Sequence, residues 1–177
     1  MEEAGNRVFN KKELIMEKSK TAGNWRTLSA FIIGSILVGS VGSVFTIPAI
    51  SGWYAGLTKP SFNPPNWIFG PVWTVLFILM GISAYLVYRS GLVKREVREA
   101  LFIFAVQFGL NVLWSYLFFG LRSPALGLAG IIALWIAIAG TIVSFTKINK
   151  SSAYLMVPYI VWVSFAAFLN GTIYILN

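Results

Sequence analysis

The sequence predicts an all-α membrane protein, a bundle of five transmembrane helices with a structured loop between the first two. Hydrophobic residues make up 57% of the 177 residues and charged residues only 11%, against about 25% charged in a typical soluble domain. Five stretches carry no charge, at 27–58, 60–88, 100–121, 123–146 and 151–177. Each can supply the roughly 20 apolar residues that cross a bilayer. The runs lack the alternation of a β-barrel, so we expect helices.

The composition also excludes several functions. The chain has no Cys and no His, which excludes disulfides, Cys/His metal centres and a Ser-His-Asp triad. We therefore expect no metal site and no required cofactor. A net charge of +8 does not indicate a nucleic-acid partner, because the basic residues lie in loops between apolar spans. The expected surroundings are membrane lipid.

We divide the chain into a polar leader, residues 1–25, and a five-helix domain, residues 26–177. The leader has no apolar core, so it is not a signal peptide, and we expect it to be disordered. The predicted spans follow in order at 28–50, 68–88, 100–119, 125–145 and 154–176. At about 1.5 Å per residue each helix is long enough to cross a bilayer.

The loop charges predict the orientation. The leader with the adjoining Arg26, the 89–99 connection and the 147–150 connection lie on one side and hold 12 of the 14 Lys and Arg residues. Only Lys59 and Arg122 lie on the other side. By the positive-inside rule the N-terminus is cytoplasmic and the C-terminus is outside. The plain basic leader favours the plasma (inner) membrane.

Two spans carry small residues at every fourth position, which allows helix backbones to approach closely. In the first span these are Ser35, Gly39 and Ser43. For both spans, the row of small residues could serve packing inside the bundle or the interface of a homodimer. The fourth span has the longer row, at Ala125, Ala129, Ala133, Ala137 and Thr141.

Polar and aromatic residues share faces of three spans. The third span has Gln107, Asn111 and Ser115 at every fourth position, with Trp114 beside them, and this face should turn inward because a lipid-facing amide lacks partners. The fifth span has Trp162, Ala166 and Asn170 at the same spacing, and the second has Trp73 on a broad aromatic face. None of the spans contains Asp, Glu, Lys or Arg, so the sequence does not support proton relays or ion-coupled transport.

These faces could converge on one aromatic cavity in the half of the membrane below the first loop. Such a cavity would suit a flat, mostly apolar ligand. Simple helix packing is the alternative for the three tryptophans at 73, 114 and 162. Trp25 and Trp135 are assigned to packing.

The first loop, residues 51–67, reads SGWYAGLTKPSFNPPNW. Three prolines and two glycines restrict its backbone, and its aromatic residues make it too apolar for a solvated linker. A folded lid over the cavity mouth and an interfacial aromatic belt both account for this composition. The aromatic residues are Trp53, Tyr54, Phe62 and Trp67.

The segments WYAGLTKPSFNPP (residues 53–65), FGLNVLWSYLFFG (108–120) and VPYIVWVSFAAFLNGTIYILN (157–177) resemble the tryptophan-rich sensory protein / translocator protein family, the former peripheral benzodiazepine receptors. The resemblance implies a five-helix bundle, often dimeric, that binds porphyrins, sterols and synthetic drugs in a cavity under the first loop. Carried over by motif, it implies a lid residue and six cavity residues, namely Tyr54, then Trp73, Asn111, Trp114, Trp162, Ala166 and Asn170.

The chain departs from the family pattern at two places. Phe62 stands where the family commonly has Trp after the Lys-Pro pair, so ring stacking is kept and the indole N–H is lost. Tyr174 lacks the nearby Arg of the animal members' proposed cholesterol motif, which makes sterol recognition there doubtful.

Three functions follow as hypotheses. The first is a receptor or sensor for tetrapyrroles such as protoporphyrin. The second, implied by the resemblance, is an enzyme that breaks down protoporphyrin under light and oxygen, with Trp73 and Trp162 as its catalytic residues and porphyrin as substrate. The third is a translocator of porphyrin or lipid-like cargo.

Overall fold

The computed structural model describes the backbone of residues 2–177 and the side chains of residues 25–177. Every regular element in this range is a helix, and five of them are long and apolar enough to span a membrane. The predicted all-α fold with five transmembrane helices is therefore confirmed. The spanning segments are 25–50, 66–88, 95–120, 124–146 and 150–176.

The spans correspond to α1 (Glu2–Ile50), α3 (Asn66–Tyr88), α4 (Arg95–Ser115), α5 (Pro124–Thr146) and α7 (Val157–Leu176). A π-helical turn, η1 (Tyr116–Gly120), prolongs α4, and the short α6 (Lys150–Leu155) precedes α7. The first loop contains one helical turn, α2 (Trp53–Gly56). We expect the leader, residues 1–25, to be disordered. The side chains of residues 1–24 lie outside the described set, so this expectation stays a prediction.

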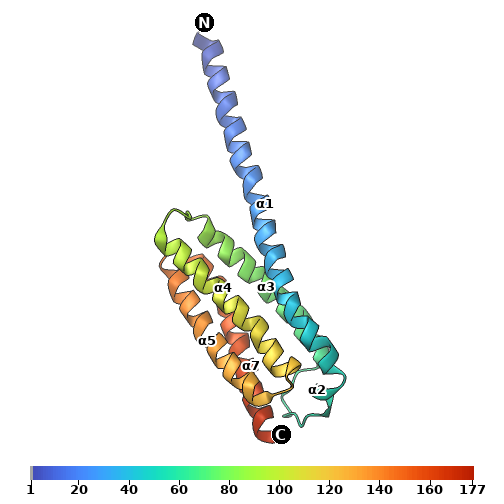
Figure 1. The fold of residues 1–177 in the computed structure, drawn as a ribbon. Coiled ribbons are helices and arrows are strands. Elements are labelled where there is room, and N and C mark those ends of the chain that lie inside the picture. Colours follow the sequence, from blue (N-terminus) through green and yellow to red (C-terminus); the bar gives the residue numbers. More distant parts are fainter. Residues whose placement is uncertain (1) are drawn as a thin grey trace.

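The five spans form a closed ring. α1 packs between α3 and α4, α4 packs on α5, α5 packs on α7, and α6 closes the ring against α3 (Figure 1). We call the end with the α3–α4 and α5–α6 connections the basic end. The opposite end, which carries α2 and the last residues of α7 (Figure 1), is called the lid end.

The half of the bundle toward the basic end is tightly packed. A Cβ on Gly81 of α3 would lie 2.7 Å from the Ile32 Cα of α1, so only glycine allows this approach. Ser83 and Ser152 join α3 to α6, each hydroxyl donating to the other's carbonyl oxygen at 2.9 Å. Fully buried side chains fill the space between the helices, among them Met80, Val87, Leu134, Ile138 and Phe145.

The two small-residue rows have different surroundings. On α1, Ser35 and Gly39 are buried, and a Cβ on Gly39 would overlap the Phe77 ring. On α5 the first three alanines of the row are exposed, and the helix packs instead through residues such as Gly127 and Gly130. Internal packing therefore explains the row on α1 but not the start of the row on α5. A homodimer through either face stays a prediction.

Candidate ligand-binding cavity

A cavity of about 420 Å³ lies toward the lid end, between α1, α3, α4 and α7. This volume falls within the range of roughly 300–1,000 Å³ that is usual for small-molecule sites. The helices stay in close contact toward the basic end, so the cavity ends at the packed half of the bundle. Its lining includes Ser40, Ser43, Thr46, Ile47, Tyr54, Asn66, Trp67, Phe69, Gly70, Trp73, Thr74, Phe77, Asn111, Trp114, Ser115, Phe118, Phe119, Ala166 and Asn170.

Aromatic rings from α3, α4 and η1 form one wall. The Trp73 ring stacks on Phe77 with centroids 5.5 Å apart and lies 6.3 Å from the Trp114 ring, tilted by 32°. Trp114 in turn stacks on Phe118 at 6.0 Å. These stacked and tilted rings make a continuous aromatic wall, to which a planar ligand can add a further stacking partner.

Hydroxyl groups line the cavity from α1 and α4. Ser40 and Thr46 donate their hydroxyl protons to carbonyls one turn earlier in α1, at 2.8 and 3.1 Å, which leaves oxygen lone pairs free to accept. The hydroxyls of Ser43 and Ser115 have no hydrogen-bond partner among the side chains that the structure describes. The cavity therefore combines an aromatic wall with several small polar groups.

Two of the three cavity amides, Asn111 and Asn170, are held by other residues. Asn111 Nδ2 donates to the Tyr159 hydroxyl oxygen at 3.0 Å. Asn170 Nδ2 donates to the Pro124 carbonyl at 2.8 Å, and Asn170 Oδ1 accepts a longer bond of 3.4 Å from Trp114 Nε1. These bonds fix the amides in place and tie α4 to α7 around the aromatic wall.

The first loop covers the lid end of the cavity and is fixed by side chains. Lys59 Nζ donates to the carbonyls of Tyr54, Ala55 and Leu57 at 2.8–3.1 Å, which satisfies the C-terminal end of α2. Asn177 pairs with the Thr58 backbone in both directions, accepting from its N–H at 2.9 Å and donating to its carbonyl at 3.0 Å. The predicted lid is thus a folded segment anchored on the end of α7.

The lid residue Tyr54 is buried and lines the cavity. Its hydroxyl donates to Asn63 Oδ1 at 2.8 Å. Burial raises the pKa of Tyr54 to about 12, so the phenol stays neutral at physiological pH. Among the residues whose side chains the structure describes, none of those lining the cavity is Asp, Glu, Lys, Arg or His.

The cavity also opens sideways, between α1 and α3. Several of its lining residues are exposed on the outer surface of the bundle, and Trp67 and Ile47 are the largest of these, at 73% and 69% exposure. The smaller exposed lining residues are Ser40, Asn66, Gly70 and Thr74. A membrane-dissolved molecule could reach the cavity through this side without displacing the lid.

The structure brings six of the eight predicted ligand-binding residues to this cavity, namely Tyr54, Trp73, Asn111, Trp114, Ala166 and Asn170. It does not bring the other two there. Trp162 is not a lining residue and packs against one, Phe69, with ring centroids 5.9 Å apart. Phe62 stacks on Phe168 at 5.2 Å, on the exposed side of α7.

Helix geometry explains the position of Trp162. Residues four apart drift by about 40° around an α-helix, so Trp162 and Asn170 point about 80° apart although they belong to one row. Asn170 and Ala166 face the cavity, whereas Trp162 faces the seam between α3 and α7. Its indole Nε1 is buried there without a partner among the described residues.

Sequence reasoning missed the contribution of α1 and η1. The hydroxyl row Ser40, Ser43 and Thr46 recurs at every third position and could have indicated a polar face toward a cavity. The π-helical turn brings both Phe118 and Phe119 into the lining. No pattern in the sequence predicted the π-helical turn, although such turns are frequent at functional sites.

Five membrane-spanning helices around a lidded aromatic cavity define a small multi-pass membrane protein. Comparison with known proteins specifies it further. The sequence profile of the TspO/MBR family matches residues 31–176, so the chain belongs to the TspO/MBR family.

Curated relatives agree with this assignment. The tryptophan-rich protein TspO of Chlorobaculum tepidum is 47% identical over 151 residues, covering 85% of this chain and 96% of the relative. A protein of the same name from Archaeoglobus fulgidus is 47% identical over 150 residues, with the same coverage. The human translocator protein is 35% identical over 148 residues, covering 82% of this chain and 87% of its own.

Proposed function

We propose that the protein is a membrane receptor that binds planar, largely apolar molecules of the tetrapyrrole class in the cavity under the lid. The observation that carries the proposal is the aligned wall of Trp73, Trp114 and Phe118 beside free hydroxyl groups. A porphyrin ring would stack on the aromatic wall, and its polar edge groups would meet the hydroxyls of Ser43 and Ser115. No metal ligand is needed, so metal-free protoporphyrin is the appropriate probe.

The setting of this receptor follows from the charges and the relatives. We propose that it lies in the plasma membrane with the basic end in the cytoplasm, because most loop Lys and Arg residues gather there. The lid would then face outward, and the side opening between α1 and α3 would face the outer leaflet.

A dark titration with metal-free protoporphyrin tests the proposal. We expect saturable binding, followed by tryptophan quenching, and a loss of about 1–3 kcal/mol of binding free energy in Trp114→Leu because a stacking partner is removed. Trp135→Leu is the matched control, since Trp135 is 40% exposed and lies outside the cavity. Equal weakening in both variants would contradict the proposed site.

Light-dependent breakdown of the bound porphyrin is a second candidate function, favoured by the position of Trp73. Its oxidisable indole lines the cavity and lies 6.1 Å from the Tyr159 ring. A photoexcited porphyrin could take one electron from this indole, and the Tyr159 ring could refill the electron deficit left on Trp73, with oxygen from air as the final oxidant. Illumination of the titrated sample in air should then bleach the porphyrin band in the wild type and spare it in Trp73→Phe. A stable porphyrin spectrum in both proteins would contradict light-dependent breakdown and support binding as the only function of the cavity.

A further inference from the structure

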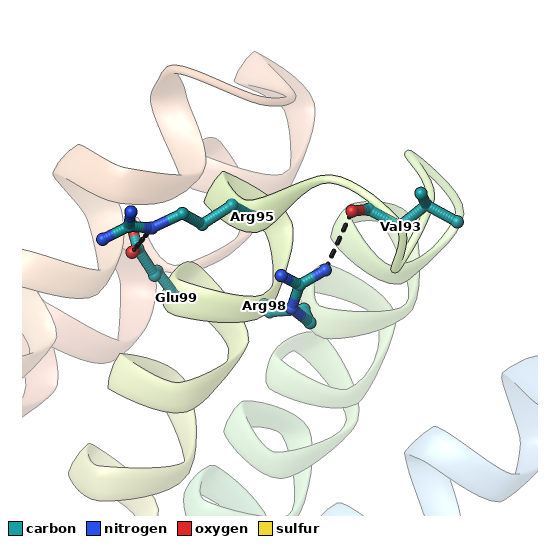
Figure 2. Close-up of polar contacts among 4 residues, drawn as sticks. All are labelled: Val93, Arg95, Arg98 and Glu99. Atoms are coloured by element: carbon teal, nitrogen blue, oxygen red, sulfur yellow. Dashed lines mark hydrogen bonds and ion pairs between the residues drawn. The ribbon is translucent and has the colours of Figure 1, made fainter.

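The basic end of the bundle carries a second surface, unrelated to the cavity, at the turn between α3 and α4. Gly91 starts the turn with φ of +105°, a conformation that favours glycine. Arg98 Nη1 of α4 reaches back and donates to the Leu92 carbonyl at 3.0 Å. It also donates to the Val93 carbonyl at 2.8 Å (Figure 2). The turn is therefore a fixed structure.

The fixed turn presents apolar side chains outward. Val93 is 94% exposed and Leu92 is 45% exposed, and the Val93 side chain points away from Arg98 (Figure 2). Since α3 and α4 are membrane-spanning helices, this tip lies at the level where the bilayer meets water. Exposed aliphatic groups at that level gain free energy by entering the acyl-chain region.

Cations surround the apolar tip. The 89–99 and 147–150 segments, both at the basic end (Figure 1), contain six basic and two acidic residues. Among the described residues, the Lys94 side chain has no hydrogen bond or ion pair. Arg95 is paired with Glu99 only through Nε, at 2.6 Å (Figure 2), and its side chain is 85% exposed. Its two Nη groups therefore remain available to an anion.

We propose that the α3–α4 turn is a docking surface for the headgroup of an anionic phospholipid. Lys94 and the free Nη groups of Arg95 contact the lipid phosphate, while Leu92 and Val93 insert among the acyl chains. Arg98 acts as a positioning residue, because it holds the turn through its two carbonyl contacts. Charge complementarity and the apolar tip together favour a lipid over a soluble anion. A soluble anion has no acyl chains that could contact Leu92 and Val93.

Native mass spectrometry tests this surface on the full chain released from bilayers of equal phosphatidylglycerol and phosphatidylcholine. We expect the wild type to retain phosphatidylglycerol preferentially, and Lys94→Gln and Arg95→Gln each to lower that preference about fivefold. Arg122→Gln removes the same charge at the exposed lid end and should leave the preference unchanged. Val93→Ser should reduce the amount of both lipids retained.

Three results would overturn the proposal. One is an unchanged lipid preference in Lys94→Gln and Arg95→Gln. Another is an equal loss in Arg122→Gln, which would reflect net charge alone. The last is displacement of the lipid by inorganic phosphate together with no effect of Val93→Ser, which would indicate a site for free anions.

Discussion

Tyr54 illustrates how burial controls a single group in this protein. Its ring packs under the lid beside Phe118 and Phe119, at 6.2 and 5.7 Å, and its hydroxyl donates to Asn63. Ionisation would place a charge in this apolar setting, which is why burial raises the pKa of Tyr54 to about 12. The folded protein therefore holds the Tyr54 proton at pH values where the unfolded chain, with a tyrosine pKa of about 10, has lost it.

This difference predicts a pH dependence of stability. Because the folded pKa is above the unfolded value, the stability contributed by Tyr54 is complete below about pH 10 and is lost as the pH rises toward 12. Tyr54→Phe should show a smaller fall in the free energy of unfolding across this range, measured by denaturation in detergent. Tyr174→Phe, at an exposed position, serves as the control. If Tyr54→Phe keeps the full wild-type slope, the burial argument is wrong.

Residue spacing predicted the site only in part. Asn111 and Trp114 line the cavity, as the inward turn of a polar face within an apolar span predicts. Trp162 was placed with Asn170 although their directions differ by about 80°. Phe62 depends on the path of a loop, which local sequence does not determine. Whether these residues bind a ligand stays a prediction.

At the scale of the helices, the contact between α1 and α3 fixes where the bundle is closed and where it opens. Gly81 lets the two backbones meet on the side of the basic end, while Trp67, Gly70 and Thr74 border the opening on the side of the lid. The length and order of the spans could be predicted from the charge-free stretches. The close approach at Gly81 could not be predicted, because the sequence does not show which helix packs against a glycine in a span.

Substitutions at two glycines test this packing. Gly81→Ala should lower the free energy of unfolding by about 1–3 kcal/mol, because its Cβ would meet the α1 backbone at 2.7 Å. Gly109→Ala is the matched control, since a Cβ there meets nothing within 4 Å. The control should be neutral or stabilising by up to about 1 kcal/mol, through higher helix propensity. Thermal unfolding in detergent compares the two, and equal effects would refute the close contact.

The lid offers a kinetic prediction. Asn177→Ala removes both hydrogen bonds to Thr58, each worth about 0.5–1.5 kcal/mol, and should loosen the loop over the cavity. Amide hydrogen exchange at Thr58 should become faster, and bound protoporphyrin should dissociate faster. Asn177→Asp keeps an acceptor for the Thr58 N–H and should give an intermediate rate. Unchanged exchange at Thr58 in Asn177→Ala would show that the anchor does not hold the lid.

On the scale of the whole molecule, the two halves of the bundle differ in how closely their helices pack. Toward the basic end, fully buried side chains such as Met80, Val87, Ile138 and Phe145 fill the space between α3 and α5. The half toward the lid end is held apart by large rings and contains the cavity. The five-helix membrane fold could be predicted because the length of each charge-free apolar stretch determines whether it can span the membrane. The difference between the two halves arises from tertiary packing, which these stretches do not reveal.

The central claim is that the cavity under the lid is the binding site, and filling it is the most direct test. Ser43 lines the cavity from α1, so Ser43→Phe should occupy ligand space. We would titrate wild-type protein and Ser43→Phe with metal-free protoporphyrin in lipid nanodiscs, in the dark, after checking that both have the same helical content. The account predicts saturable binding to the wild type and at least tenfold weaker binding to Ser43→Phe. Equal binding to both proteins would contradict it.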